Sequence, residues 1–250
     1  MMALLAIVLS SCDGLSIPNT QQLRYTCASS CALGRAGRAS SPRCCCDIAT
    51  EAESLTRAWI EQHVVKLGLC PYAAQPFSEE TIRYHTTEAT TEAALFEEFM
   101  TEGLLLLDSP ELSTTMLIAP RYTGDCADFY AFYERLTEML EDESEELLSN
   151  RIQPAFFHPQ WTFDGLDAED AVHFEKRAPL PVINLLRRSQ LDDAVRAGLE
   201  RGEVVNQQIA EHNEAALRRA GSAALRRLFV ELAAPPVGSP AGEVYARSDA

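Results

Sequence analysis

The sequence lacks the glycine-rich loop with which many proteins bind nucleotide phosphates. Its 12 glycines are spread along 250 residues, and Gly68 and Gly165 stand alone, outside any G-x-G-x-x-G or G-x-x-x-x-G-K motif. Such motifs allow backbone N–H groups to approach a phosphate closely. Their absence disfavours dinucleotide cofactors and P-loop chemistry.

Basic side chains are also few. The chain has 21 Lys and Arg residues against 37 Asp and Glu residues, and its formal net charge is −16 at pH 7. The first 50 residues carry +2, which leaves −18 for the rest of the chain. A body this acidic repels a phosphate backbone, so nucleic acid is not expected as a partner. The simplest role of the charge is to keep the protein soluble.

Cysteine is scarce outside the first 50 residues. Six of the eight cysteines lie there, and Cys70 and Cys126 are the other two. Two thiols do not make a disulfide framework, so a reducing compartment is expected. The three cysteines at 44–46 have no zinc-finger spacing and no histidine nearby, and no histidine or acidic residue elsewhere follows a strong metal motif. No metal site is therefore predicted, and no particular cofactor is indicated.

The N-terminus has no apolar run long enough to cross a bilayer. The run at residues 3–9 has the length of a signal-peptide h-region. Residues 16–43 are then rich in Ser, Ala, Arg and Cys and contain no acid, as in a transit peptide. We therefore expect residues 1–49 to be a targeting leader, similar to the two-part leaders of algae with complex plastids. The expected location is the plastid, with the mitochondrion as the alternative, and no membrane span is expected in the mature protein.

Residues 50–233 alternate between helix and strand patterns. A capping box, Thr50-x-x-Glu53, precedes a helix that extends to about Leu67. Two further helices are expected at about 90–107 and 125–140, and helices also fill the C-terminal part from 189 to about 232. Short strands are expected at 81–86, 114–119, 152–157 and 181–186. Residues 234–250 are expected to be a disordered tail.

This order of elements predicts a single α/β domain. It would be a small layered domain of about four strands, largely parallel, flanked by helices and followed by an α-helical C-terminal part. The alternative is a ferredoxin-like α+β sandwich, which applies if the fourth strand pairs antiparallel.

Most of the unusual chemistry falls between residues 150 and 188. One predicted strand ends before His158, a loop containing Trp161 follows, and Arg177 comes just before a Pro-x-Pro sequence. The next predicted strand carries Asn184 and ends at Arg187. Two short strands that enclose a polar, aromatic loop are typical of a pocket. His158 would also lie at the carboxyl end of a strand, where α/β sheets bind ligands.

Four sequence patterns occur together and in a fixed order. They are Leu67-Gly68-Leu69-Cys70-Pro71-Tyr72-Ala73, Phe157-His158-Pro159, Phe163-x-Gly165, and Arg177-x-Pro179-x-Pro181 followed by Leu185-Leu186-Arg187. The set resembles the mainly bacterial family catalogued as domain of unknown function 1415, over about residues 54–232. The resemblance implies no activity, because the family has no established one. The chain departs from the family pattern at His173, Lys176, Ala178 and Asn184, and Asn184 replaces a frequent histidine.

Two functions remain open. The first is an enzyme acting on a small anionic metabolite, in which Arg177 and Arg187 hold the anion beside Trp161 and Asn184. In it, His158 is a general acid or base and Cys70 is a nucleophile or redox group. The second is a non-catalytic module that binds a cofactor or a tetrapyrrole, with Cys70 and His158 as axial ligands. No oligomeric state follows from the sequence.

The two functions predict different geometries, and structural roles compete with both. An enzyme of this kind would bring Cys70, His158 and the arginines together around an open pocket. A binding module would show a wide apolar slot with few charged groups. Alternatively, Cys70 is a buried small hydrophobe, His158 is a hydrogen-bonded structural histidine, and Arg177 is a clamp for Asp170 or Glu169.

Overall fold

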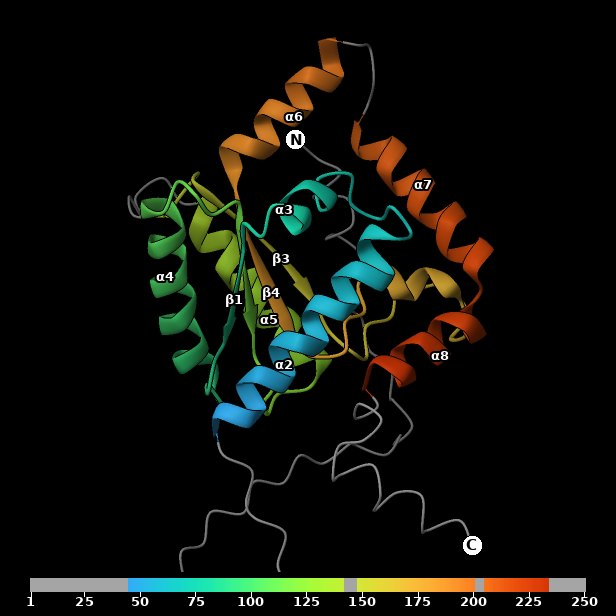
Figure 1. Ribbon diagram of the computed structural model, residues 1–250, viewed down its shortest axis with the longest axis horizontal. Helices are drawn as coiled ribbons and strands as arrows, with labels where there is room; N and C mark the ends of the chain where they lie inside the picture. The colour runs from blue at the N-terminus through green and yellow to red at the C-terminus, as the bar shows by residue number, and fades with distance from the viewer. Residues whose placement is uncertain (1–44, 142–147, 201–204, 234–250) are drawn as a thin grey trace, which may run out of the picture.

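A four-stranded sheet forms the middle layer of the protein (Figure 1). The computed structural model describes residues 45–141, 148–200 and 205–233. The sheet order is β1-β2-β4-β3. Its strands are β1 (Ile82–Thr86), β2 (Thr114–Ile118), β3 (Ile152–Phe157) and β4 (Val182–Arg187).

The strand directions make this a mixed sheet. β1 and β2 pair in parallel, whereas β4 pairs antiparallel with both β2 and β3. The predicted α/β class with four strands is confirmed. Three strands point the same way, but only one of the three pairs is parallel. The reason is that residues 158–181 return the chain directly into the gap between β2 and β3, without the helical crossover that a parallel neighbour needs.

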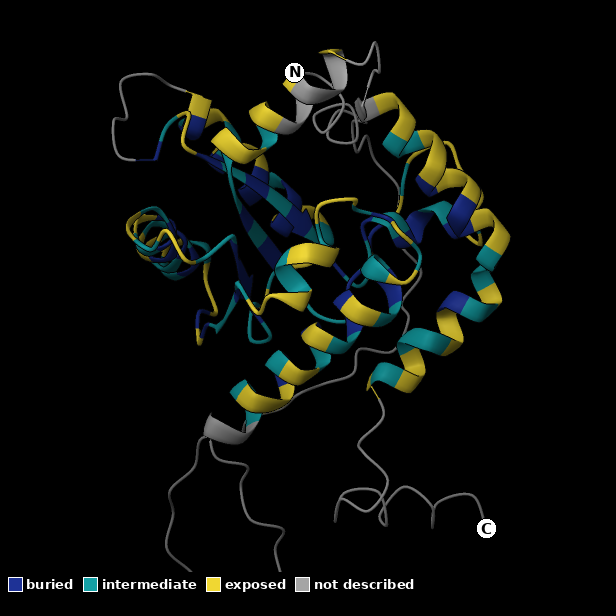
Figure 2. Cartoon of the chain, turned by 45° about the horizontal axis from the view of Figure 1, so that its top comes forward, coloured by how far each residue is buried: buried dark blue, intermediate teal, exposed yellow. Residues whose placement is uncertain are grey.

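Helices cover both faces of the sheet, so the protein is not a ferredoxin-like sandwich. α4 (Glu92–Asp108) and α5 (Cys126–Glu141) lie on one face, and α2 (Cys45–Trp59) lies on the other (Figure 1). The α5 side contains an aromatic core built around Phe129, Tyr133 and Phe156. The α2 side contains a second core with Trp59 and Met116. Figure 2 shows the strands in the colours of buried and intermediate residues, without the exposed residues that mark the outer faces of the helices.

The C-terminal helices extend the α2 side. They are α6 (Arg188–Glu200), α7 (Val205–Ala220) and α8 (Ser222–Ala233). α7 and α8 pack against a short 3-10 helix, η2 (Ala171–Glu175), through a third core that contains Phe174, Leu217 and Leu225. Together with α2, these helices enclose the space beside the sheet.

α2 begins at Cys45, ahead of the start that the capping box predicted, so Thr50 lies inside the helix. Residues 1–44, which hold most of the predicted leader, lie outside the described residues, as does the predicted tail at 234–250. None of the described helices has both the length and the apolar character needed to cross a membrane.

Candidate functional site

A cavity of about 170 Å³ lies between the sheet and the helices on the α2 side. Its floor consists of side chains from all four strands, and its walls come from α2, the following π-helix, the loop after it, α6 and α7. The lining residues include Trp59, Ile60, Val64, Leu69, Cys70, Tyr72, Ile82, Thr114, Met116, Ala155, Phe157, Glu175, Lys176, Asn184, Leu186, Leu191, Ile209 and Asn213. Most of these side chains are apolar.

A change in helix type shapes the roof of the cavity. α2 continues into a π-helix, η1 (Ile60–Val65), in which the Lys66 N–H bonds the Glu61 carbonyl at 3.1 Å. π-helical turns are rare and occur frequently at functional sites. Gly68 then adopts a φ of +68°, a conformation that favours glycine, and an added Cβ would meet the His212 ring at 3.2 Å. This turn sends the following loop back over the sheet.

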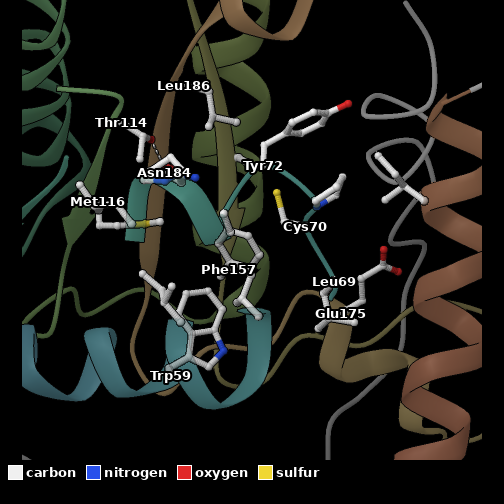
Figure 3. A pocket seen from close by; sticks show the side chains of 18 of the residues that line it. Trp59, Leu69, Cys70, Tyr72, Thr114, Met116, Phe157, Glu175, Asn184 and Leu186 are labelled. Carbon is white, nitrogen blue, oxygen red and sulfur yellow. Dashed lines mark hydrogen bonds between the residues drawn. The ribbon is translucent and has the colours of Figure 1, made fainter. Parts of the chain in front are cut away.

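The alternation of the strands decides which side chains form the floor. On β4, Asn184 and Leu186 face the cavity, whereas Ile183 and Leu185 belong to the core on the opposite face. Ala155 lies directly opposite Asn184 on β3, and its small side chain leaves room above the middle of the sheet. Figure 3 shows Thr114 and Asn184 on one side of the cavity and Glu175 on the other.

The polar pair on the sheet joins β2 to β4. Thr114 Oγ1 lies 2.5 Å from Asn184 Oδ1 and 2.7 Å from the Leu185 carbonyl oxygen. The hydroxyl has a single hydrogen and can donate to one of these oxygens at a time. In either arrangement the Asn184 amide keeps hydrogen-bonding capacity that no described residue uses.

A second polar group lies where η2 meets α7. Asn213 Nδ2 donates to Glu175 Oε1 at 2.9 Å, and the next residue is Lys176. Burial raises the pKa of Glu175, while the hydrogen bond from Asn213 and the charge of Lys176 act in the opposite direction. Burial lowers the pKa of Lys176, against the opposing charge of Glu175. Each ionised form is therefore destabilised by the apolar surroundings.

Two buried polar atoms of the lining have no hydrogen-bond partner in the described part of the chain. They are Nε1 of Trp59 and Oδ1 of Asn213, in residues that are 1% and 3% exposed. Buried polar groups are paired in the great majority of cases. An unpaired donor and an unpaired acceptor therefore belong to two residues that line this cavity.

Two of the residues predicted for the site line the cavity. They are Cys70, predicted as a nucleophile or redox group, and Asn184, predicted to contact the ligand. Burial raises the pKa of the Cys70 thiol, and backbone N–H groups at Tyr72 and Ala73 offset this only in part. A reactive cysteine needs a depressed pKa, because the thiolate is the nucleophile. Cys70 is thus placed as a neutral thiol.

His158 lies away from the cavity. It is 5% exposed, and its ring is 5.6 Å from that of Phe129 on α5. The Gln160 N–H donates to Nδ1 at 3.3 Å, and burial lowers the pKa of His158 to about 4. Cys70 and His158 are therefore on opposite sides of the sheet, and the expected convergence of these two residues does not occur.

Arg187 also points away from the cavity. Its guanidinium donates to the carbonyl oxygens of Leu112 at 3.1 Å and Ser109 at 2.7 Å, and to that of Leu106. Leu106 and Ser109 lie at the C-terminal end of α4. Because Asn184 and Arg187 are separated by an odd number of positions on one strand, they face opposite sides.

Arg177 and Trp161 lie together in the loop after β3. Arg177 Nε donates to the Trp161 carbonyl at 2.8 Å, and its guanidinium lies 4.8 Å from the centre of the Phe174 ring. Trp161 is buried against Phe156 on the α5 side. The two acids considered as partners of Arg177 form ion pairs elsewhere, Asp170 with Arg218 and Glu169 with Arg226.

Sequence reasoning missed most of the polar lining, which includes Trp59, Glu175, Lys176 and Asn213. A signal for Asn213 existed, because it falls on the apolar stripe of α7 beside Ala216 and Leu217. Lys176 was marked by its departure from the family pattern, but a lysine in a polar loop is ordinary and did not indicate a buried amine. Among the described residues, no group of three or more His, Cys, Asp or Glu side chains could hold a metal ion.

Comparison with known proteins gives a family and no activity. A family model described as "Protein of unknown function (DUF1415)" matches residues 51–227. No curated protein and no solved structure matches the chain. The family match covers most of the chain, including every residue that lines the cavity, and so this chain belongs to the DUF1415 family.

Proposed function

We propose that the protein binds a small, largely apolar molecule with a polar end in the cavity between the sheet and α2. The observation that carries this proposal is the pair of unpartnered polar atoms, Trp59 Nε1 and Asn213 Oδ1, in an otherwise apolar lining. Leaving a buried group unpaired costs about 1–3 kcal/mol. A ligand that pairs with either atom recovers that cost in addition to the free energy of burying its apolar part.

The cavity size limits the ligand. An apolar cavity of about 150 Å³ accommodates benzene, and the volume here is about 170 Å³. The ligand therefore has about one ring or a short chain in the enclosed part. A tetrapyrrole is much larger, and Cys70 and His158 could not ligate one iron from opposite sides of the sheet.

Ligand binding is better supported than catalysis that uses the residues predicted from the sequence. An enzyme built on Cys70, His158, Arg177 and Arg187 needs them around one pocket, and of these four Cys70 alone lines this one. A binding module was expected to show an apolar slot with few charged groups. Here Glu175 and Lys176 are the only charged residues among the described residues of the lining.

The two tryptophans allow a direct test by NMR. Both indole N–H groups are buried and unpartnered in the described structure, but only Trp59 lines the cavity. Benzyl alcohol, benzoate and toluene should be titrated separately into uniformly ¹⁵N-labelled protein. We expect the Trp59 indole signal to move with benzyl alcohol or benzoate, while the Trp161 signal stays in place. The variants Trp59→Phe and Trp161→Phe assign the two signals.

A variant that fills the cavity provides the control. Ala155→Leu adds a larger side chain to the middle of the floor and should abolish the Trp59 shift. Equal shifts of both indole signals, or a Trp59 shift that Ala155→Leu leaves unchanged, would show that the probes do not bind in this cavity. If Ala155→Leu does abolish the Trp59 shift, native mass spectrometry of the protein from its own cells is the next step and would identify the natural ligand.

A further inference from the structure

Lys176 is an unusual lysine in its surroundings. The chain contains two lysines, Lys66 and Lys176. Lys66 is exposed and bonds Gln62 on the helix surface. Lys176 is 8% exposed and lines the cavity. Its Nζ lies 5.5 Å from the centre of the Phe157 ring and 5.8 Å from that of Phe156.

No described residue gives the Lys176 amine a hydrogen bond or an ion pair within salt-bridge distance. Its contacts are two aromatic faces and the electrostatic effect of Glu175, which itself accepts from Asn213. A buried ammonium with so little compensation is costly, and burial favours the neutral amine. A neutral amine carries a free lone pair, and apolar pockets that desolvate a lysine are a known way to make it nucleophilic.

We propose that Lys176 is a nucleophilic amine that forms an imine with the carbonyl group of a small aldehyde or ketone held in the cavity. The inference rests on the proposed function in one respect, since the carbonyl compound must enter the same cavity. It assigns the cavity a ligand class, a single-ring or short-chain carbonyl compound, and a reversible covalent step.

The step balances without an oxidant or a reductant. The Nζ lone pair attacks the carbonyl carbon, the C–N bond forms, and the carbonyl π electrons move to the oxygen, which takes a proton to give a carbinolamine. Loss of water from the carbinolamine then forms the C=N bond. The two protons that leave with the oxygen as water come, in net, from the amine nitrogen. We assign the exchange of these protons, through water, to Glu175, whose charge acts on Lys176 from beyond salt-bridge distance.

The surroundings suit an imine. Phe157, Trp59 and Met116 give the cavity an apolar lining, and apolar surroundings disfavour the water that hydrolyses a C=N bond. The other titratable side chains of this lining are Cys70, Tyr72 and Glu175, and burial raises the pKa of the Cys70 thiol. None of the three carries a positive charge.

Reductive trapping with benzaldehyde tests the proposal on the intact protein. Benzaldehyde and sodium borohydride are added at pH 7, which converts an imine into a stable benzylamine. Peptide mass mapping then locates the added benzyl group. Each unit by which the pKa of an amine falls gives about tenfold more free amine at neutral pH. We expect Lys176 to be labelled at least about tenfold faster than Lys66, its exposed counterpart.

Variants show where the reactivity originates. Lys176→Met keeps an unbranched apolar side chain and should lose the rapid label while Lys66 reacts as before. Ala155→Leu should slow labelling of Lys176 and leave Lys66 unchanged, because it fills the cavity. Glu175→Gln should slow formation of the imine. The comparison of the two lysines in the unaltered chain needs no variant, so it stands even if Lys176→Met does not fold.

The outcomes separate the two proposals. If Lys176 reacts no faster than Lys66 while benzyl alcohol still shifts the Trp59 indole signal, the imine proposal is wrong and the cavity remains a binding site. If neither effect occurs, the cavity takes up neither probe and both proposals are wrong. Rapid labelling that requires both Lys176 and an unfilled cavity supports the imine.

Discussion

Replacing Arg187 by methionine should destabilise the protein without affecting the cavity. The last carbonyl groups of a helix have no partner within it. The Arg187 guanidinium supplies donors to Leu106 and Ser109 at the end of α4, and another to Leu112 in the connection to β2. A cation at this end also interacts favourably with the helix dipole. Methionine retains most of the apolar stem and removes all of these interactions.

The expected loss follows from the number of bonds. Three hydrogen bonds at about 1 kcal/mol each, with a smaller helix-dipole contribution, give roughly 3 kcal/mol. In a domain of this size that corresponds to a melting temperature lower by about 6–12 °C. Arg188→Met is the matched control, because the Arg188 side chain has no hydrogen-bond or ion-pair partner among the described residues. It should change stability by less than about 0.5 kcal/mol.

Urea unfolding followed by far-ultraviolet circular dichroism measures both variants. Arg187→Met should shift the midpoint with little change in slope, and benzyl alcohol should still move its Trp59 indole signal. Equal midpoints for the two variants would show that the contacts at the end of α4 contribute nothing. Loss of probe binding at unchanged stability would instead restore Arg187 as a ligand contact.

Two further predictions concern buried titratable groups. Burial lowers the pKa of His63 and of His158 from 6.5 to about 4. The unfolded chain therefore binds protons at these sites before the folded chain does. Their contribution to stability is complete above pH 6.5 and is lost as the pH falls from 6.5 to 4, by roughly 3 kcal/mol for each histidine. Urea unfolding at pH 7 and pH 4.5 checks this, and the non-titrating variants His63→Gln and His158→Asn should each show a smaller loss than the unaltered chain. Cys70 should be alkylated slowly by iodoacetamide at pH 7 in the folded protein and much faster in urea, because burial raises its pKa. Rapid alkylation of the folded protein at neutral pH, located by mass spectrometry, would mean that the thiol is activated.

The strands could be located from sequence because their signals are local. Apolar alternation bounded by proline or polar residues predicted 152–157 and 181–186, and the strands are Ile152–Phe157 and Val182–Arg187. The pairing of β4 could not be predicted in the same way. Its sequence gives the face that each residue presents but does not identify its neighbours, which depend on how residues 158–181 fold back.

The candidate site was predicted less well, for a related reason. Closeness in sequence suggested that His158, Arg177, Asn184 and Arg187 share a pocket. The two-residue period of a strand already separates Asn184 from Arg187, and the structure places them on opposite faces. On β1 and β2 the lining includes the first residues, Ile82 and Thr114, whereas on β3 it reaches the last residue, Phe157.

The sequence pattern did not predict the π-helix that covers the cavity. The helical period of residues 50–67 predicts one continuous helix, whereas the structure changes to a π-helix at Ile60. Lys176 acquires its burial from α7 and β3, which are distant in sequence.

The position of β4 has a consequence for how the chain folds during synthesis. β4 lies between β2 and β3, yet it is the last of the four strands to leave the ribosome. Until then, β2 and β3 each present an unpaired edge on the side that β4 will occupy, and unpaired edges pair readily with other chains. The sheet, and with it the floor of the cavity, forms only after residue 187 has been added. Between the appearance of β2 and that of β4, a growing chain of this protein therefore depends on protection from pairing with other chains.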